Sequence, residues 1–221
     1  MLADADRGAG HDAAQAAGGL NRRLVTVPPG GWFGGTAGPG AELWFVIAGA
    51  GRLDAGQWAG APLGHDTGLW LPPDAEYRLG AGPDDEVLLD VVALPAGPAR
   101  AQEPAAPRMS QLRDCPVEQT GDRRFRVLLG PGRGCEAATQ FLGEIPPGRA
   151  PEHIHPYNEV VLVLEGAGVL HAGDADRALA RGTIVHLPPG LPHCLENTGT
   201  GTLVVLGVFH PGGSPAQKTA G

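Results

Sequence analysis

The chain has 221 residues, of which 42% are hydrophobic and 18% are charged, and its formal net charge is −8. This length suits two domains of about 100 residues each, and the hydrophobic share is enough for packed cores. The negative charge argues against nucleic acid and anionic membranes as partners, and no apolar run approaches the roughly 20 residues of a membrane-spanning helix.

The first 20 residues are rich in Ala, Gly and Asp and show no periodic pattern, so we expect a flexible tail at residues 1–20. This stretch contains acidic residues and lacks the apolar core of a signal peptide, which predicts a cytoplasmic protein. The three cysteines are widely spaced and form no C-x-x-C pair, so we expect free thiols in that reducing compartment.

The middle of the chain repeats itself at an offset of about 117 residues, and a repeat of this length predicts two whole domains. The matched blocks keep the same order in both halves. They are TVPPG (26–30) with EIPPG (144–148), AELWFVIAGAGRL (41–53) with NEVVLVLEGAGVL (158–170), and LWLPPDAEY (69–77) with VHLPPGLPH (185–193).

Each copy is expected to consist of short strands, because β-branched and aromatic runs alternate with glycines and prolines. The runs that end at Pro-Pro cannot continue a strand ladder. Such a pattern is typical of an all-β sandwich or small barrel. We therefore expect an N-terminal barrel at residues 21–95, a Pro/Ala linker at 96–107, a C-terminal barrel at 108–211 and a second loose end at 212–221.

Candidate metal ligands lie in the segment GRAPEHIHPYNEVVLVLEG, residues 148–166. His153, His155 and Glu159 share one parity, so in an extended strand their side chains project to one face. His193, which follows a Pro-Pro-Gly turn, is the candidate for a fourth ligand from another strand. Imidazole and carboxylate ligands suit one divalent transition metal, and Fe, Mn, Ni, Co, Cu and Zn all remain open.

The two spacings G-x4-H-x-H-x3-E-x6-G and G-x5-P-x-G-x2-H-x3-N resemble the signature motifs of the cupin superfamily. They are carried by Gly148, His153, His155, Glu159 and Gly166, and by Gly182, Pro188, Gly190, His193 and Asn197. The first gap is one residue shorter than the commonest family spacing. The resemblance implies two tandem cupin barrels, that is, an all-β double-stranded β-helix or jelly roll, with the metal in the C-terminal barrel.

The N-terminal copy keeps the barrel pattern and loses the ligands. Glu42 aligns with Glu159, whereas Thr36, Gly38 and Tyr77 stand where the three histidines would be. A single carboxylate does not hold a transition metal, because imidazoles supply most of the affinity of such sites. The resemblance to proteins with two cupin domains implies a structural N-terminal barrel, and a homodimer is left open as the assembly.

Two residues outside the motifs are candidates for contact with a substrate. Tyr157 shares the parity of the metal ligands, and Gln140 or its neighbour Phe141 should face the cavity from the preceding strand. We take Tyr157 and Gln140 as catalytic candidates, with Glu144 and Glu152 as further carboxylates nearby. The remaining residues of note are expected to serve the fold: His171, His186, His210, Cys194 and Asn197.

Four ligands leave two positions open on an octahedral metal, which favours a substrate that chelates through oxygen. The resemblance to cupin dioxygenases makes an oxygenase that acts on a small polar metabolite the leading hypothesis. Two alternatives stay open. One is a non-redox isomerase, lyase or aminohydrolase, since the layout also resembles ureidoglycine aminohydrolases; the other is a small-molecule-binding protein without catalysis.

Overall fold

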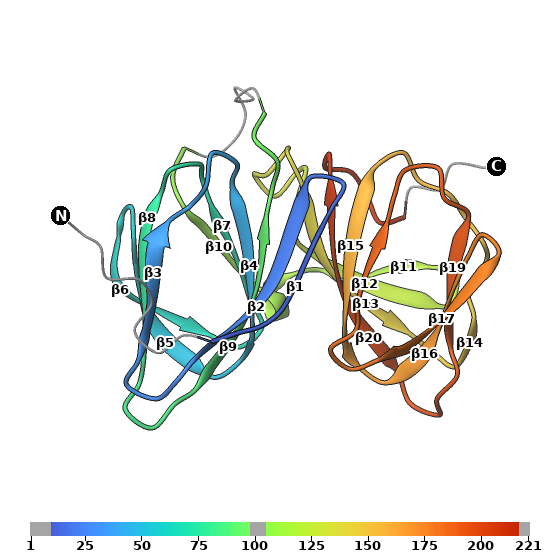
Figure 1. Ribbon diagram of the computed structural model, residues 1–221, viewed down its shortest axis with the longest axis horizontal. Coiled ribbons are helices and arrows are strands. Elements are labelled where there is room, and N and C mark those ends of the chain that lie inside the picture. Colours follow the sequence, from blue (N-terminus) through green and yellow to red (C-terminus); the bar gives the residue numbers. More distant parts are fainter. Residues whose placement is uncertain (1–9, 98–104, 217–221) are drawn as a thin grey trace. The chain divides into compact units, whose positions relative to one another are not determined.

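The computed structural model describes residues 10–97 and 105–216, and these residues form two compact units divided after Asp114 (Figure 1). In the described part of the chain the regular structure is β, apart from one single-turn 3-10 helix, η1 (Leu112–Asp114). The expectation of an all-β protein is therefore confirmed. None of the helical structure in these ranges is long and apolar enough to cross a membrane.

The first unit contains a six-stranded antiparallel sheet and a four-stranded antiparallel sheet. In spatial order the larger sheet consists of β1 (Gly10–Ala17), β2 (Leu20–Val27), β9 (Val87–Ala93), β4 (Glu42–Ala48), β7 (Thr67–Leu71) and β10 (Arg108–Gln111). The smaller sheet consists of β3 (Trp32–Thr36), β8 (Glu76–Ala81), β5 (Ala50–Ala55) and β6 (Trp58–Gly64).

The second unit has the same construction. Its larger sheet consists, in spatial order, of β11 (Glu118–Thr120), β12 (Arg123–Leu129), β13 (Thr139–Ile145), β20 (Leu203–His210), β15 (Asn158–Glu165) and β18 (Ile184–Leu187). Its smaller sheet consists of β14 (Gly148–Arg149), β19 (His193–Asn197), β16 (Ala167–Ala172) and β17 (Ala175–Ala180). In Figure 1 the strands of each unit wrap around an interior, which gives each unit the form of a flattened barrel.

Matching glycines turn the chain at the same point of both barrels. Gly49 after β4 and Gly166 after β15 have φ values of 78° and 84°, a left-handed conformation that suits a residue without Cβ. A Cβ would also collide with backbone, at the carbonyl oxygen of Glu86 in the first unit and at that of Thr202, 2.8 Å away, in the second. The repeat in the sequence thus corresponds to a repeated turn geometry.

The apolar core of each unit lies between its two sheets, where alternate residues of the strands point inward. In the second unit the core includes Val161, Val163, Leu187 and Val205. In the first unit it is larger and includes aromatic side chains. Bulky aromatic side chains therefore fill the core of the first unit, whereas the core cluster of the second unit is aliphatic.

Three of the expected boundaries are wrong. Residues 10–17 of the expected tail form strand β1, which pairs with β2, and residues 1–9 lie outside the described residues. Strand β10, expected to open the second domain, pairs instead with β7 of the first unit. Gly213, in the expected loose end at 212–221, is held to the second unit, because the Thr139 hydroxyl donates to its carbonyl over 2.8 Å; residues 217–221 lie outside the described residues.

These differences share a physical cause. Strand pairing satisfies backbone N–H and C=O groups whatever the side chains are, so an Ala/Gly-rich or linker-like segment can still pair with a sheet edge. Of the expected linker at 96–107, residues 98–104 lie outside the described residues.

Candidate metal centre

Three candidate ligands come together inside the second barrel. The ligand atoms of His155, Glu159 and His193 all lie within 4.8 Å of one another, and all three residues are buried. Glu159 projects from β15, His193 stands at the start of β19, and His155 lies in the segment that leads into β15. His153 and His155 lie before β15, between Pro151 and Pro156, which cannot donate to a strand ladder. The expectation that they share one extended strand with Glu159 therefore holds only in part.

The buried histidines are held by their own backbone surroundings. The Nδ1 atom of His155 lies 2.8 Å from the carbonyl oxygen of Tyr157, and the Nδ1 atom of His193 lies 2.9 Å from that of Leu191. A neutral imidazole that donates from Nδ1 keeps its lone pair on Nε2, the tautomer that metal-binding histidines commonly adopt. Both rings therefore offer an Nε2 acceptor to the site.

The imidazole of His155 faces the carboxylate of Glu159. The Nε2 atom of His155 is buried, has no hydrogen-bond partner within the described residues, and lies 3.1 Å from a carboxylate oxygen of Glu159. A buried polar atom without a partner costs about 1–3 kcal/mol, so native structures rarely keep one without a reason. A cation between the imidazole nitrogens and the carboxylate would satisfy it.

His153 lies beside this group of three but does not belong to it. Its backbone N–H and carbonyl pair with those of His193 over 3.0 Å each, and the two ring centroids are 4.4 Å apart. Its Nδ1 atom is 3.3 Å from the carbonyl oxygen of Pro151, the same arrangement as in the other two histidines. His153 is thus placed next to the predicted site, and its role as a ligand stays a prediction.

Burial favours the neutral forms of His153 and His193. Desolvation, with a smaller contribution from the neighbouring His193, lowers the pKa of His153 to about 4. Desolvation likewise lowers the pKa of His193, although its hydrogen bond to Leu191 opposes this. Metal ions bind the neutral imidazole, so these shifts favour ligation at neutral pH.

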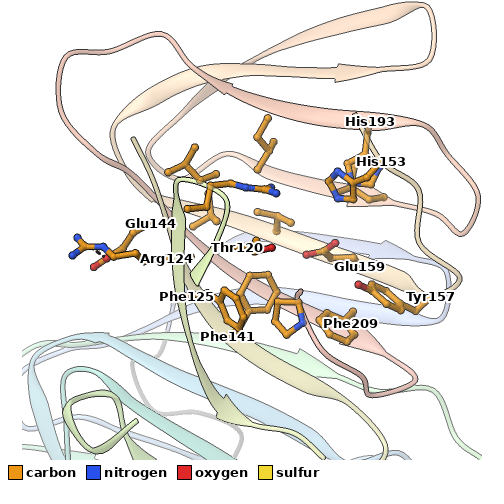
Figure 2. Close-up of a pocket in the computed structure, with 18 residues that line it drawn as sticks. Thr120, Arg124, Phe125, Phe141, Glu144, His153, Tyr157, Glu159, His193 and Phe209 are labelled. Carbon is orange, nitrogen blue, oxygen red and sulfur yellow. Dashed lines mark ion pairs between the residues drawn. The ribbon is translucent and has the colours of Figure 1, made fainter. Parts of the chain in front are cut away.

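A cavity of about 90 Å³ opens beside the ligands. Since a cavity needs at least roughly 10–15 Å³ to hold one water, this one has room for several waters or a small organic molecule. Figure 2 shows His153 and His193 at one side of it, with Glu159 pointing toward them and Phe125 and Phe141 across from them. Apart from the ligands and a few polar groups, the wall is apolar: Phe125, Phe141, Val161, Leu187, Val205 and Phe209.

Tyr157 lines the cavity, as its parity predicts. Its ring stacks on His155, with centroids 4.3 Å apart, and on Phe209, with centroids 4.1 Å apart. Burial raises the pKa of the Tyr157 phenol, and the nearby carboxylate of Glu159 adds to the effect. The phenol is therefore a neutral hydrogen-bond donor at the cavity wall.

The choice of Gln140 as a catalytic candidate is wrong. Phe141 lines the cavity from β13, and strand alternation turns its neighbour Gln140 to the opposite face, where it is buried. Gly207 on the adjacent strand makes room for this arrangement, because a Cβ there would overlap the Phe141 ring and approach Glu159.

The remaining sequence candidates lie away from the cavity or are already paired. Glu144 reaches the cavity wall but forms an ion pair with Arg124 at 3.0 Å, and Glu152 is exposed. Asn197 fixes a turn through hydrogen bonds to Ile145 and Gly201, as expected. The others do not line the cavity: His171, His186, Cys194 and His210.

Strands β11 and β12 also form part of the cavity wall, which the sequence did not predict. Thr120, Arg123 and Phe125 all line the cavity, and Thr120 pairs with Arg123 across the two strands. Arg124 also lines the cavity, but its guanidinium is paired with Glu144 at 3.0 Å. The alternation in RRFR therefore would not have singled out Arg123.

In the first unit the equivalent interior is filled. Phe33, Trp44 and Tyr77 are buried and in mutual ring contact, with centroids between 4.7 and 5.3 Å apart. The indole N–H of Trp44 donates to the carboxylate of Glu42 over 2.8 Å, and Arg23 lies 3.7 Å from the same side chain. Trp44 stands at the repeat position of Val161, so an indole occupies space that the second barrel leaves open.

The second unit matches a known family model. Residues 141–209 match the model described as the Cupin domain. Gentisate 1,2-dioxygenase from a Ralstonia species is 34% identical to this chain over 102 residues, 42% of this chain and 28% of that protein. The match thus spans under a third of the length of that relative.

Solved structures resemble the chain over most of its length. Protein Ylba from E. coli has a TM-score of 0.76 at 11% identity, over 95% of this chain and 86% of that one. Oxalate decarboxylase from Lactobacillus farciminis, solved as a formate complex, has a TM-score of 0.72 at 14% identity, over 87% of this chain and 77% of that one. At such identities the likeness concerns the fold.

Proposed function

We propose that this chain, whose residues 141–209 match the Cupin domain model, is a metal-dependent enzyme that oxidises a small molecule with dioxygen. One observation carries the proposal. His155, Glu159 and His193 converge next to a cavity of small-molecule size, and the Nε2 atom of His155 is buried without a hydrogen-bond partner.

The metal is proposed to be bound by His153, His155, Glu159 and His193. Three imidazoles and one carboxylate suit iron or manganese, as they suit other divalent transition metals. When bound, such a metal would act as a Lewis acid and as a template for the substrate and dioxygen. The hydrogen bonds from Nδ1 to backbone carbonyls would orient the imidazoles toward it.

Other side chains of the cavity would bind and orient the substrate. The neutral Tyr157 phenol is proposed to donate a hydrogen bond to a substrate oxygen, since its raised pKa keeps the proton in place. The apolar wall of Phe125, Phe141 and Phe209 would exclude water and pack against the body of the substrate.

Dioxygenation is preferred over the non-redox alternatives because of the gentisate 1,2-dioxygenase relative, whose similarity to this chain rests on 102 residues. We further propose that the first unit is a cupin barrel that has lost its metal site. Its aromatic cluster of Phe33, Trp44 and Tyr77 and the Trp44–Glu42 hydrogen bond support this proposal.

Oxygen uptake tests the reaction. Protein reconstituted with Fe²⁺ or Mn²⁺ is incubated with small aromatic and aliphatic hydroxy acids in an oxygen electrode, and products are identified by mass spectrometry. We expect oxygen consumption in step with product. Turnover at the same rate without oxygen would replace dioxygenation by non-redox chemistry, and tight binding without turnover would reduce the protein to a binding module.

A further inference from the structure

Arg123 is a cation of the cavity that has no partner of its own. Its side chain lines the cavity, and its Nε–H is buried without an acceptor. Over residues 10–97 and 105–216 no hydrogen bond or ion pair to its guanidinium is found, in contrast to Arg124, whose guanidinium pairs with Glu144. A partly buried guanidinium without a counter-ion loses hydration without compensation, so a bound anion would stabilise it.

Arg123 shares its cavity with the candidate metal ligands, so an anion bound to Arg123 can be one group of a small molecule that also reaches the metal site. Of these ligands, His153, Glu159 and His193 line the same cavity as Arg123. Thr120, paired with Arg123 across β11 and β12, adds a hydroxyl to the same wall. A molecule that occupies this cavity and reaches the histidines would also be exposed to these two residues.

We propose that Arg123 binds a carboxylate of the substrate, so that the substrate is a small acid with an apolar or aromatic body and a metal-chelating oxygen. This inference deepens the proposed function and rests on it for the chelating end. A planar guanidinium matches a carboxylate through paired hydrogen bonds, and one cation balances one carboxylate. The phenylalanines that line the same cavity suit a ring better than a hydrophilic chain.

Benzoate and its uncharged isostere benzamide test the carboxylate preference. Both are titrated by ligand-observed NMR at pH 8 into the full chain, once metal-free and once loaded with redox-inactive Zn²⁺. We expect benzoate to bind at least about tenfold more tightly than benzamide in both forms, because a hydrogen bond to a charged group contributes more than a neutral one.

Three variants separate Arg123 from general effects. Arg123→Met is expected to bring the benzoate-to-benzamide ratio close to one, and Arg123→Lys to keep part of it. Arg126→Met is the matched control, since Arg126 lies on the same strand with the opposite parity and does not line the cavity. It is expected to keep the full ratio.

A benzoate preference confined to the Zn²⁺-loaded protein would overturn the inference, because it would place the carboxylate on the metal. A preference that Arg123→Met leaves unchanged would also overturn it. Absence of any benzoate preference in the wild type would overturn it as well. Zinc content is measured in parallel and is expected to be the same in Arg123→Met and wild type. Failure of the metal site thus appears as lost zinc, separately from failure of the carboxylate site.

Discussion

At the scale of single residues, hydrogen bonds to backbone carbonyls orient the rings of His155 and His193. A pre-oriented imidazole loses little rotational freedom on ligation, which favours affinity. The ring of Tyr157 helps to hold the His155 ring in place, because it is stacked between His155 and Phe209. Its ring and its hydroxyl therefore have separable roles.

Two substitutions of Tyr157 distinguish those roles. Tyr157→Phe keeps the stacked ring, so we expect wild-type metal affinity and a kcat/KM lowered about three- to tenfold by loss of one hydrogen bond. Tyr157→Leu removes the stack and is expected to weaken metal affinity by about tenfold. Metal titration and steady-state kinetics measure the two effects. Equal metal affinity in both variants would contradict a positioning role for the ring.

His171 gives a pH-dependent contribution to stability on the smaller sheet of the second unit. Its Nε2 is 2.8 Å from Glu196 and its Nδ1 is 2.6 Å from Asp176. The hydrogen bond to Glu196, followed by that to Asp176, raises the pKa of His171. A raised folded-state pKa stabilises the protein below the ordinary histidine pKa of about 6.5, and this contribution is lost as the pH rises through the folded pKa.

We therefore expect His171→Gln to lower the melting temperature more at pH 5.5 than at pH 9. His186 serves as a control of opposite sign, because burial lowers its pKa. Its neutral form is favoured in the folded state, so His186→Gln should cost more at pH 9 than at pH 5.5. Thermal unfolding followed by circular dichroism measures both. A His171→Gln effect that is independent of pH would disagree with the ion-pair assignment.

At the scale of elements, the same strand arrangement builds an open interior in one unit and a filled one in the other. Val161 on β15 and Trp44 on β4 occupy matching positions, and each faces its own core. The aromatic cluster around Trp44 therefore supports the first barrel, where the second has a cavity.

Removing the Trp44 indole tests this role. Trp44→Ala is expected to lower the free energy of unfolding of the first unit by about 3–5 kcal/mol through cavity formation and lost contacts. All four tryptophans lie in the first unit, so the fluorescence of the remaining three follows its denaturant unfolding. Trp32→Ala, at a half-buried position, should cost clearly less. Equal costs in the two variants would argue against a supporting cluster.

The strands and turns that could be predicted from the sequence are those with a recognisable pattern of residue types. The β-branched runs, the paired Pro-Pro stops and the repeated glycines identified the strands and turns of both copies. Strands β1 and β10 escaped because their pairing rests on backbone hydrogen bonds at sheet edges, for which composition gives little signal. Arg123 escaped because its importance depends on an absent counter-ion, which only three-dimensional contacts reveal.

At the scale of the whole molecule, the described residues form two units with the same arrangement of sheets. Each unit pairs a six-stranded sheet with a four-stranded one, yet the described histidine and carboxylate cluster belongs to the second. A barrel fold alone does not specify chemistry, because function depends on which side chains line the interior. The contrast between Glu42, bonded to Trp44, and Glu159, facing His155, illustrates this within one chain.

We propose that the second unit binds one metal ion through its histidines and Glu159, and that the first unit binds none. Elemental analysis of the full chain after reconstitution with Mn²⁺ or Fe²⁺ tests it most directly. We predict one metal per chain, severe loss in His153→Ala, His155→Ala, Glu159→Ala and His193→Ala, and no change in Glu42→Gln and Tyr77→Phe. Full occupancy in His155→Ala and His193→Ala, or loss of metal in Glu42→Gln, would contradict the account.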